Sequence, residues 1–208
     1  MSLLAFFAAA LLLAVTPGPG IAYVVARTVA GGRAEGLASC LGTGLGGMVH
    51  VLAAALGLSL LIAESATAFA LVKYAGAAYL VYLGLRLLLR RAPEAVAPDV
   101  PNALASQGAR RAFFEGILVE TLNVKTALFF LAFLPQFVDP AAPLVPQLVL
   151  LGSVCVALNT LADVVAVFAA ERLLGSSAAR AVRARLLTRL SGTTMLALGA
   201  YLAVARRD

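Results

Sequence analysis

The sequence predicts an all-α polytopic membrane protein. Six transmembrane helices would form two inverted three-helix repeats, with broken first and fourth helices. Three observations predict this fold class. Of the 208 residues, 62% are hydrophobic and 12% are charged, with a mean hydropathy of +0.98, which excludes a soluble domain of this size. The basic residues gather in alternate links between apolar runs, and two unusual stretches recur at the same offset in the two halves of the chain.

Six apolar runs are each long enough for the roughly 20 residues that a helix needs to cross a bilayer. The runs are residues 3–26, 37–63, 67–89, 112–138, 144–170 and 187–205. The third link between runs is rich in proline and predicts a loop. It divides the chain into a first three-helix repeat (1–91), a linker (92–111) and a second three-helix repeat (112–208).

The positions of the basic residues predict the orientation in the membrane. Twelve of the 16 Lys and Arg residues lie in or beside the first, third and fifth links. Cytoplasmic links carry an excess of Lys and Arg, so these links, including 92–111, are predicted to be cytoplasmic and both termini external. Arg206 and Arg207 oppose this orientation, and a last run that lies along the interface is the alternative. The net charge of +6 therefore indicates an anionic membrane surface as partner, and not nucleic acid.

The first apolar run contains a motif that breaks a helix. Pro17 and Pro19 have no backbone N–H, so in a continuous helix the carbonyl groups of Leu13 and Val15 would lose their donors. Such a break survives in a membrane where protein or a water-filled cavity surrounds it, as in transporter binding sites. A simple proline kink is the alternative. The predicted break comprises Thr16, Pro17, Gly18, Pro19 and Gly20.

The two halves of the chain resemble each other at this break. Ala5-Phe6-Phe7 matches Ala112-Phe113-Phe114, and at the same offset Thr16-Pro17-Gly18 falls on Asn123-Val124-Lys125. Halves of three spans enter the membrane in opposite senses. An inverted repeat is therefore predicted, with its binding site at the repeat interface near the midplane. Chance similarity between helices rich in Ala and Leu is the alternative.

Both breaks carry a residue that favours a helix start. Thr16 followed by Pro17 is typical of an N-cap and a first helical position, and Asn123 is an equally good N-cap for a half-helix that begins at Val124. The free N–H groups and positive dipole ends of these half-helices would face the midplane from opposite leaflets. We therefore expect them to hold an anionic group, for which a substrate carboxylate is the obvious candidate.

Polar residues inside the apolar runs are further candidates. Lys125 needs a nearby anion, which Glu120, Asp163 or a bound carboxylate could supply; a pair that only clamps helices is the alternative. Glu120 is closer in sequence to Lys125 and is expected to pair with it, which leaves Asp163 as the favoured proton-coupling group. Asn159 shares a helical face with Asp163 and could hold a polar substrate. For His50, a structural hydrogen bond is favoured over a proton relay. No His or Cys cluster has metal-site spacing.

Small residues in the apolar runs predict packing. Glycines concentrate in the second run and favour close helix contact, and the two cysteines are expected to be small buried hydrophobic residues. These residues are Gly42, Gly44, Gly46, Gly47, Cys40 and Cys155.

Taken together, these residues resemble the lysine exporter (LysE) superfamily in its threonine/homoserine exporter (RhtB) branch, over nearly the whole chain. The marks are the glycines of the second run with Thr16-Pro17-Gly18-Pro19, Lys73-Tyr74-Ala75-Gly76, Tyr82-Leu83-Gly84, Asn123-Val124-Lys125 and Phe133-Leu134-Pro135-Gln136-Phe137. The chain departs from the family pattern at Val124, where proline is usual, at Gly20, where a polar residue often stands, and at Glu120.

The resemblance implies a secondary transporter, and not an enzyme, that exports amino acids or close derivatives across the bacterial inner membrane by proton antiport. The implied partners are the amino acid, protons and membrane lipid. No cofactor is implied, and a homodimer is left open. Two other functions stay open: a transmembrane thiol–disulfide electron carrier that uses Cys40 and Cys155, and a metal-cation exporter with Glu120 and Asp163 as ligands. A scaffold protein without transport would leave the broken helices unexplained.

Overall fold

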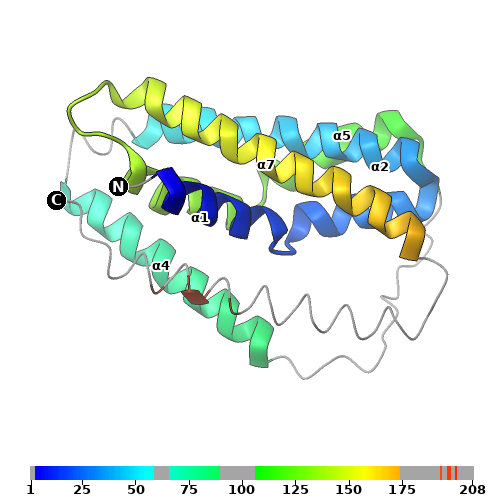
Figure 1. The fold of residues 1–208 in the computed structure, drawn as a ribbon, viewed down its shortest axis with the longest axis horizontal. Coiled ribbons are helices and arrows are strands. Elements are labelled where there is room, and N and C mark those ends of the chain that lie inside the picture. Colours follow the sequence, from blue (N-terminus) through cyan, green and yellow to red (C-terminus); the bar gives the residue numbers. More distant parts are fainter. Residues whose placement is uncertain are drawn as a thin grey trace.

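The computed structural model describes residues 3–58, 66–89 and 106–173, and single helical positions at 193, 196, 197 and 200. These ranges are helical and contain no strand, which confirms the predicted all-α class (Figure 1). Most of the predicted sixth span (187–205) and of the predicted linker (92–111) lies outside the described residues.

The helices follow the apolar runs, and helix is interrupted at both predicted breaks. One break separates α1 from α2 and the other separates α5 from α6. The elements are α1 (Leu3–Val15), α2 (Pro19–Ala53), the π-helical turn η1 (Ala54–Leu58), α4 (Ala66–Leu89), α5 (Ala109–Thr121), α6 (Val124–Leu128), the π-helical turn η2 (Phe129–Phe133), the 3₁₀ helix η3 (Leu134–Phe137) and α7 (Leu144–Leu173). In space, α2 packs against α5 and α7, and α1 packs against α7 (Figure 1).

The helical segment α2 reverses direction within its length. Gly32 has φ 74° and ψ −168°, a conformation outside the helical region that favours glycine. Arg27 and Glu35 form an ion pair of 3.5 Å across this residue, although eight residues of straight helix would separate them by about 12 Å. The chain therefore turns back at Gly32, inside the link that the sequence predicts between the first two apolar runs.

The long helices have the length and composition of membrane spans. By length and composition, the segments Pro19–Gly57, which includes the turn at Gly32, and Leu144–Ala170 are apolar enough to cross a bilayer, and the bent pair Ala109–Thr121 with Val124–Phe137 qualifies as a third. Their outward faces carry large apolar side chains, such as Leu41 and Leu150, which are 65% and 66% exposed. Such a surface suits lipid, because water would make it prone to aggregation.

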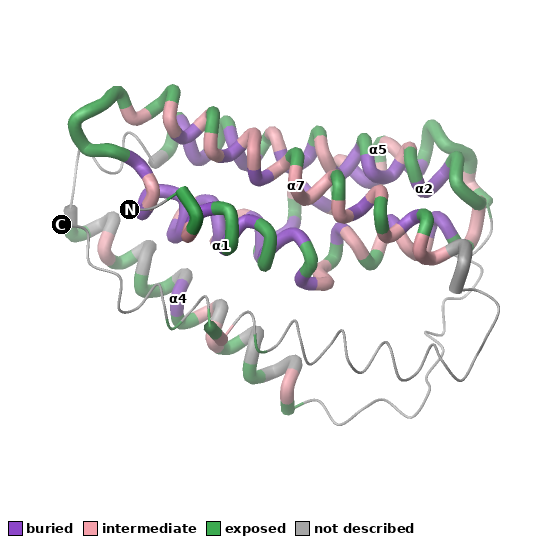
Figure 2. The backbone as a smooth tube through the Cα atoms, viewed as in Figure 1, coloured by how far each residue is buried: buried purple, intermediate pink, exposed green. Residues whose placement is uncertain are grey.

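The core lies where the two breaks meet α7. Phe6 of α1, Phe129 and Phe133 of η2, and Leu148 of α7 are at most 2% exposed and pack in one apolar cluster. Figure 2 shows the buried positions gathered between α1, α2, α5 and α7, with exposed positions on the outside. This packing brings the two interrupted spans to the middle of the molecule.

Glycines let α2 approach its neighbours closely, as the sequence predicts. A Cβ on Gly42 would lie 2.1 Å from the backbone carbonyl oxygen of Phe113, and one on Gly46 would lie 2.6 Å from that of Ile117, both in α5. On another face of α2, Gly44 packs against Thr160 of α7. The α2–α5 contact is therefore backbone to backbone, as in close small-residue packing.

Candidate functional site

The first break ends α1 with a threonine and starts α2 with a proline. Thr16 donates its hydroxyl hydrogen to the carbonyl oxygen of Leu12, and Pro17 and Gly18 lie outside helix. Gly18 is the N-cap, since its carbonyl oxygen accepts the first helical hydrogen bond of α2 at 3.0 Å and Pro19 is the first helical residue. The prediction that Thr16 caps a half-helix beginning at Pro17 is therefore wrong. Its hydroxyl closes the preceding helix because an acceptor four residues earlier is within reach.

The second break matches its prediction. The side chain of Asn123 accepts a hydrogen bond of 3.1 Å from the backbone N–H of Lys125, which is an N-cap contact, and α6 begins at Val124. The helices on the two sides of this break are bent by 44°. Val124 stands where the resembled family usually has proline, yet the break is present, because Asn123 supplies the cap.

Lys125 connects the second break to the first. Its ammonium nitrogen Nζ donates to the carbonyl oxygens of Thr16 at 2.9 Å and of Leu13 at 3.4 Å. Leu13 is one of the residues whose carbonyl group the prolines were predicted to deprive of a donor. A cation also suits this place, because the C-terminal end of α1 carries partial negative charge. Gly18 leaves room for the side chain, since a Cβ there would lie 2.9 Å from Nζ.

Glu120 is held by neutral donors. Its carboxylate accepts hydrogen bonds from the hydroxyl of Thr126 at 2.7 Å and from the side-chain amide of Asn123 at 3.0 Å. A Cβ on Gly20 would lie 2.5 Å from the same carboxylate, so Glu120 reaches the start of α2. The expected pairing of Glu120 with Lys125 is wrong, because the ammonium group is directed to the carbonyl oxygens of α1.

His50 braces the second break from α2. Its ring nitrogen Nε2 lies 2.8 Å from the backbone carbonyl oxygen of Glu120, the acceptor in this contact. The backbone N–H of Asn123 bonds to the same oxygen at 2.9 Å. The structure thus places His50 in a structural hydrogen bond, which is the role that the sequence analysis favours.

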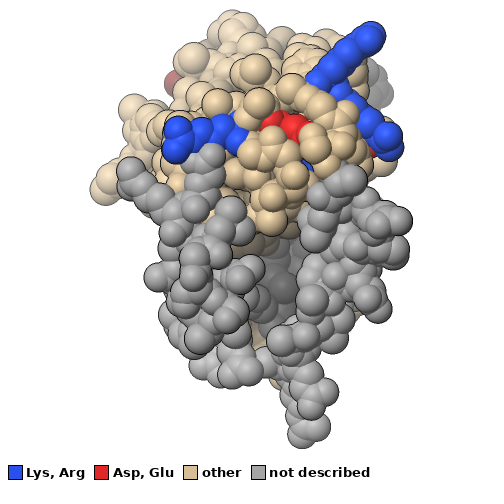
Figure 3. All heavy atoms as spheres, turned by 90° about the vertical axis from the view of Figure 1, so that its right-hand side faces the viewer, with Lys and Arg blue, Asp and Glu red and all other residues tan. Residues whose placement is uncertain are grey.

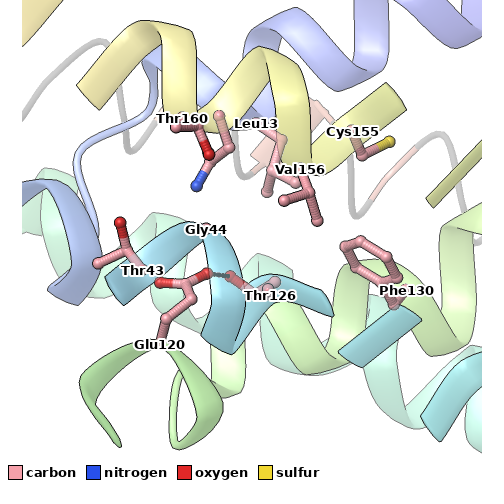
Figure 4. Close-up of a pocket in the computed structure, with 11 residues that line it drawn as sticks. Leu13, Thr43, Gly44, Glu120, Thr126, Phe130, Cys155, Val156 and Thr160 are labelled. Atoms are coloured by element: carbon pink, nitrogen blue, oxygen red, sulfur yellow. Dashed lines mark hydrogen bonds between the residues drawn. The ribbon is translucent and has the colours of Figure 1, made fainter. Parts of the chain in front are cut away.

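Asp163 and Asn159 of α7 face the same region. Asp163 is 2% exposed and accepts a hydrogen bond of 3.0 Å from the hydroxyl of Thr43 on α2. Thr43 and Asn159 line a small cavity together with Glu120 and Thr126 (Figure 4). The structure therefore brings the predicted residues of α2, α5, α6 and α7 to one place, where polar groups from both halves of the chain meet.

The cavity in this structure is closed. Its volume is about 10 Å³, which is about the space for one water molecule. Figure 4 shows Glu120 and Thr43 on one side, with Thr160 and Val156 of α7 across from them. A larger molecule would need α2 and α7 to separate before it could bind here.

Two functional candidates were missed by the sequence analysis. Thr43 and Thr126 supply the hydroxyl groups that bond Asp163 and Glu120. Threonine in an apolar helix commonly bonds its own backbone, as Thr43 also does to the carbonyl oxygen of Cys40. Their residue type therefore gave no signal, although each lies within four residues of a predicted site residue or of the glycine cluster.

The two cysteines lie in different apolar clusters. Cys40 packs with Val24 and Val167, whereas Cys155 belongs to the phenylalanine-rich core, and both are free thiols. Neither is placed as a redox partner of the other in this structure. Within the described ranges, no group of three His, Cys, Asp or Glu side chains could hold a metal ion.

A third buried carboxylate, that of Glu35, joins the turn at Gly32 to the start of α5. Glu35 accepts hydrogen bonds from the hydroxyl of Ser106 at 2.6 Å and from the backbone N–H groups of Gln107 and Gly108, each at 2.8 Å. Figure 3 shows Lys and Arg side chains gathered on this end of the molecule. The first and third links, both predicted to be cytoplasmic, therefore meet at one end.

Apolar helices of spanning length and two interruptions around a buried polar cluster define the class: a helical membrane protein with the architecture of a translocator. The comparisons with known proteins give the family. The family model described as LysE type translocator matches residues 11–206. The chain thus belongs to the LysE family of translocators, whose members are transporters and not enzymes.

Several curated relatives are similar over much of the chain. A homoserine/homoserine lactone efflux protein of Salmonella typhi is 30% identical over 97% of this chain and 96% of its own length. An uncharacterized membrane protein of Vibrio cholerae is 30% identical over 98% of this chain and 97% of its own length. A leucine efflux protein of Salmonella choleraesuis is 30% identical over 66% of this chain and 64% of its own length. No solved structure matches the chain significantly.

Proposed function

We propose that this protein is a secondary transporter that exports amino acids or close derivatives across the bacterial inner membrane by proton antiport. Membership in a translocator family and the names of the efflux relatives support the substrate class. The observation that carries the proposal is the contact between the two breaks, in which Lys125 of the second break donates to the carbonyl oxygen of Thr16 in the first. Broken helices that meet in a buried polar cluster are the usual form of a transporter binding site.

The proposed architecture has six spans in two inverted repeats, with both termini outside and the linker 92–111 in the cytoplasm. In support, two helices of 13 residues, α1 and α5, each precede a break. The meeting of the first and third links at Glu35 also fits their placement on one side of the membrane. A homodimer is compatible with this arrangement.

The substrate carboxylate is proposed to bind at the breaks near the midplane. The first break offers the start of α2 at Pro19 and Gly20, and the second offers Asn123 and Lys125. Asn159, on the cavity wall opposite, would hold a polar group of the substrate. Entry requires a more open conformation than the closed one described above, as alternating access provides.

Asp163 is proposed to carry the coupling proton. Its bond to Thr43 links α7 to α2, so gaining or losing a proton would change a contact between the two helices that enclose the cavity. The variant Asp163→Asn should exchange substrate across vesicle membranes, yet lose accumulation driven by a pH gradient. The variant Glu120→Gln, assayed at saturating substrate, is the comparison. If the pH gradient drives uptake in Asp163→Asn but not in Glu120→Gln, then Glu120, and not Asp163, carries the coupling proton. If it drives uptake in both, neither carboxylate couples.

An export assay tests the proposed function itself. Cells with and without the gene are loaded with dipeptides, and the amino acids that leave them are measured over time. The proposal expects one or a few amino acids to leave faster from cells that carry the gene. Identical efflux of every amino acid from the two kinds of cell, with the protein present in the membrane, would contradict it.

A further inference from the structure

The buried polar cluster carries more negative than positive charge. Glu120, Asp163 and Lys125 are 1%, 2% and 7% exposed. When Asp163 is deprotonated, two carboxylates and one ammonium group leave one negative charge without a counterion. An unpaired charge away from water is costly, so the cluster favours a monovalent cation as an additional occupant.

The ammonium group of Lys125 does not form a hydrogen bond with the carboxylate of Glu120. Its ammonium group is bonded to the carbonyl oxygens of Thr16 and Leu13, at the end of α1 that already carries partial negative charge. The hydrogen-bond donors to Glu120 are the neutral side chains of Asn123 and Thr126. Glu120 is therefore solvated by dipoles but lacks a bonded cation, which distinguishes it from a simple structural ion pair.

The cavity places further oxygen atoms near this carboxylate. Glu120, Asn159 and Thr160 all line the cavity (Figure 4). Thr43 also lines it and donates a hydrogen bond to the carboxylate of Asp163. A primary ammonium group has three donors and no acceptor. A carboxylate on one side of the cavity, with an amide oxygen and a hydroxyl oxygen on the α7 side, are the acceptors that such a group needs.

We propose that Glu120 binds the ammonium group of the transported amino acid. This inference rests on the proposed function and adds the group of the substrate that is recognised. The ammonium group would neutralise the charge that the cluster leaves unpaired, while the substrate carboxylate lies toward the starts of the half-helices. Recognition of the ammonium group is thus separate from recognition of the carboxylate.

Two analogues of alanine separate the two groups. Alaninamide keeps the ammonium group and lacks the carboxylate, whereas N-acetylalanine keeps the carboxylate and lacks the ammonium group. Purified wild-type protein should gain thermal stability from alaninamide through the ammonium group, and from N-acetylalanine only through the separate contacts of the carboxylate. Glu120→Gln should raise the alaninamide concentration needed for half of this effect at least tenfold, and Glu120→Asp should retain part of the response.

Glu115→Gln is the matched control, since Glu115 lies in the same helix and pairs with Arg111 at the exposed end. It should respond to alaninamide as the wild type does. No protection of the wild type by alaninamide, or an unchanged response to alaninamide in Glu120→Gln, would overturn the inference. If the Glu120→Gln protein does not fold, the response of Glu120→Asp to alaninamide decides: a response equal to that of the wild type would contradict the inference.

The export assay keeps this inference distinct from the proposed function. If the wild type exports an amino acid but alaninamide does not inhibit transport of that amino acid in vesicles, the ammonium site is refuted and the proposed exporter stands. Protection by alaninamide without export of any amino acid would refute the exporter and leave the ammonium site standing.

Discussion

Replacement of Lys125 by methionine separates its structural role from a role in transport. Methionine keeps most of the side-chain length and removes the charge, so the carbonyl oxygens of Thr16 and Leu13 lose their donor. The charged hydrogen bond to Thr16, at 2.9 Å, is the stronger of the two. The variant therefore tests a hydrogen-bonded contact that joins the two breaks.

Two opposing free energies decide the effect on stability. Loss of a hydrogen bond to a charged group costs about 1.5–3 kcal/mol. Removal of an ammonium group from the interior of a membrane protein regains about 2.5–3.5 kcal/mol. These terms nearly cancel, so we expect the free energy of unfolding to change by less than about 2 kcal/mol. The protein should fold and reach the membrane.

Transport has no such compensation. If Lys125 holds the substrate carboxylate or the end of α1 during transport, losing one charged hydrogen bond lowers the transport rate by roughly 10- to 100-fold. The assays are export from dipeptide-loaded cells, membrane abundance by immunoblot, and thermal unfolding in detergent. Gly57→Ala is the control, since a Cβ there meets nothing within 4 Å. Normal export by Lys125→Met at normal abundance would refute the reasoning.

Two further predictions concern topology and packing. A cysteine at Ala141 should react with an impermeant thiol reagent added outside intact cells and one at Ser106 should not; the reverse pattern would overturn the orientation. Gly42→Ala should lower the free energy of unfolding by about 1–3 kcal/mol, since its Cβ would lie 2.1 Å from a carbonyl oxygen of α5. Ordinary contact needs about 3.3 Å, so the helices must part by about 1 Å. Thermal unfolding of Gly42→Ala, with Gly57→Ala as the control, measures this loss of stability. Equal stability of the two variants would contradict the close contact of α2 and α5.

The breaks could be predicted because proline and asparagine act locally. Pro17 and Pro19 remove hydrogen-bond donors wherever the helix packs, and Asn123 caps the residues that follow it directly. The start of α2 was misplaced by two residues because both prolines can occupy a first helical position. The choice between them depends on the hydroxyl of Thr16, which bonds backward to Leu12.

The partners of the buried charges could not be predicted in the same way. Glu120 and Lys125 are five residues apart across a break, so helical periodicity does not say whether their side chains meet. Lys125 instead finds acceptors 109 and 112 residues earlier, and Glu35 finds donors 71 to 73 residues later. Such contacts depend on how the helices pack in three dimensions. The predicted inverted repeat and orientation remain predictions.

The contacts of Glu35 bear on how the two halves of the chain stay together. This side chain comes from the first half and accepts hydrogen bonds from the N–H groups of Gln107 and Gly108, directly before α5, which has no side-chain cap of its own. Together with the glycine-mediated contact of α2 and α5, the hydrogen bonds of Glu35 hold the two halves together by noncovalent contacts that do not depend on the linker. A gene divided within 92–105 should therefore yield two separate polypeptides that assemble in the membrane.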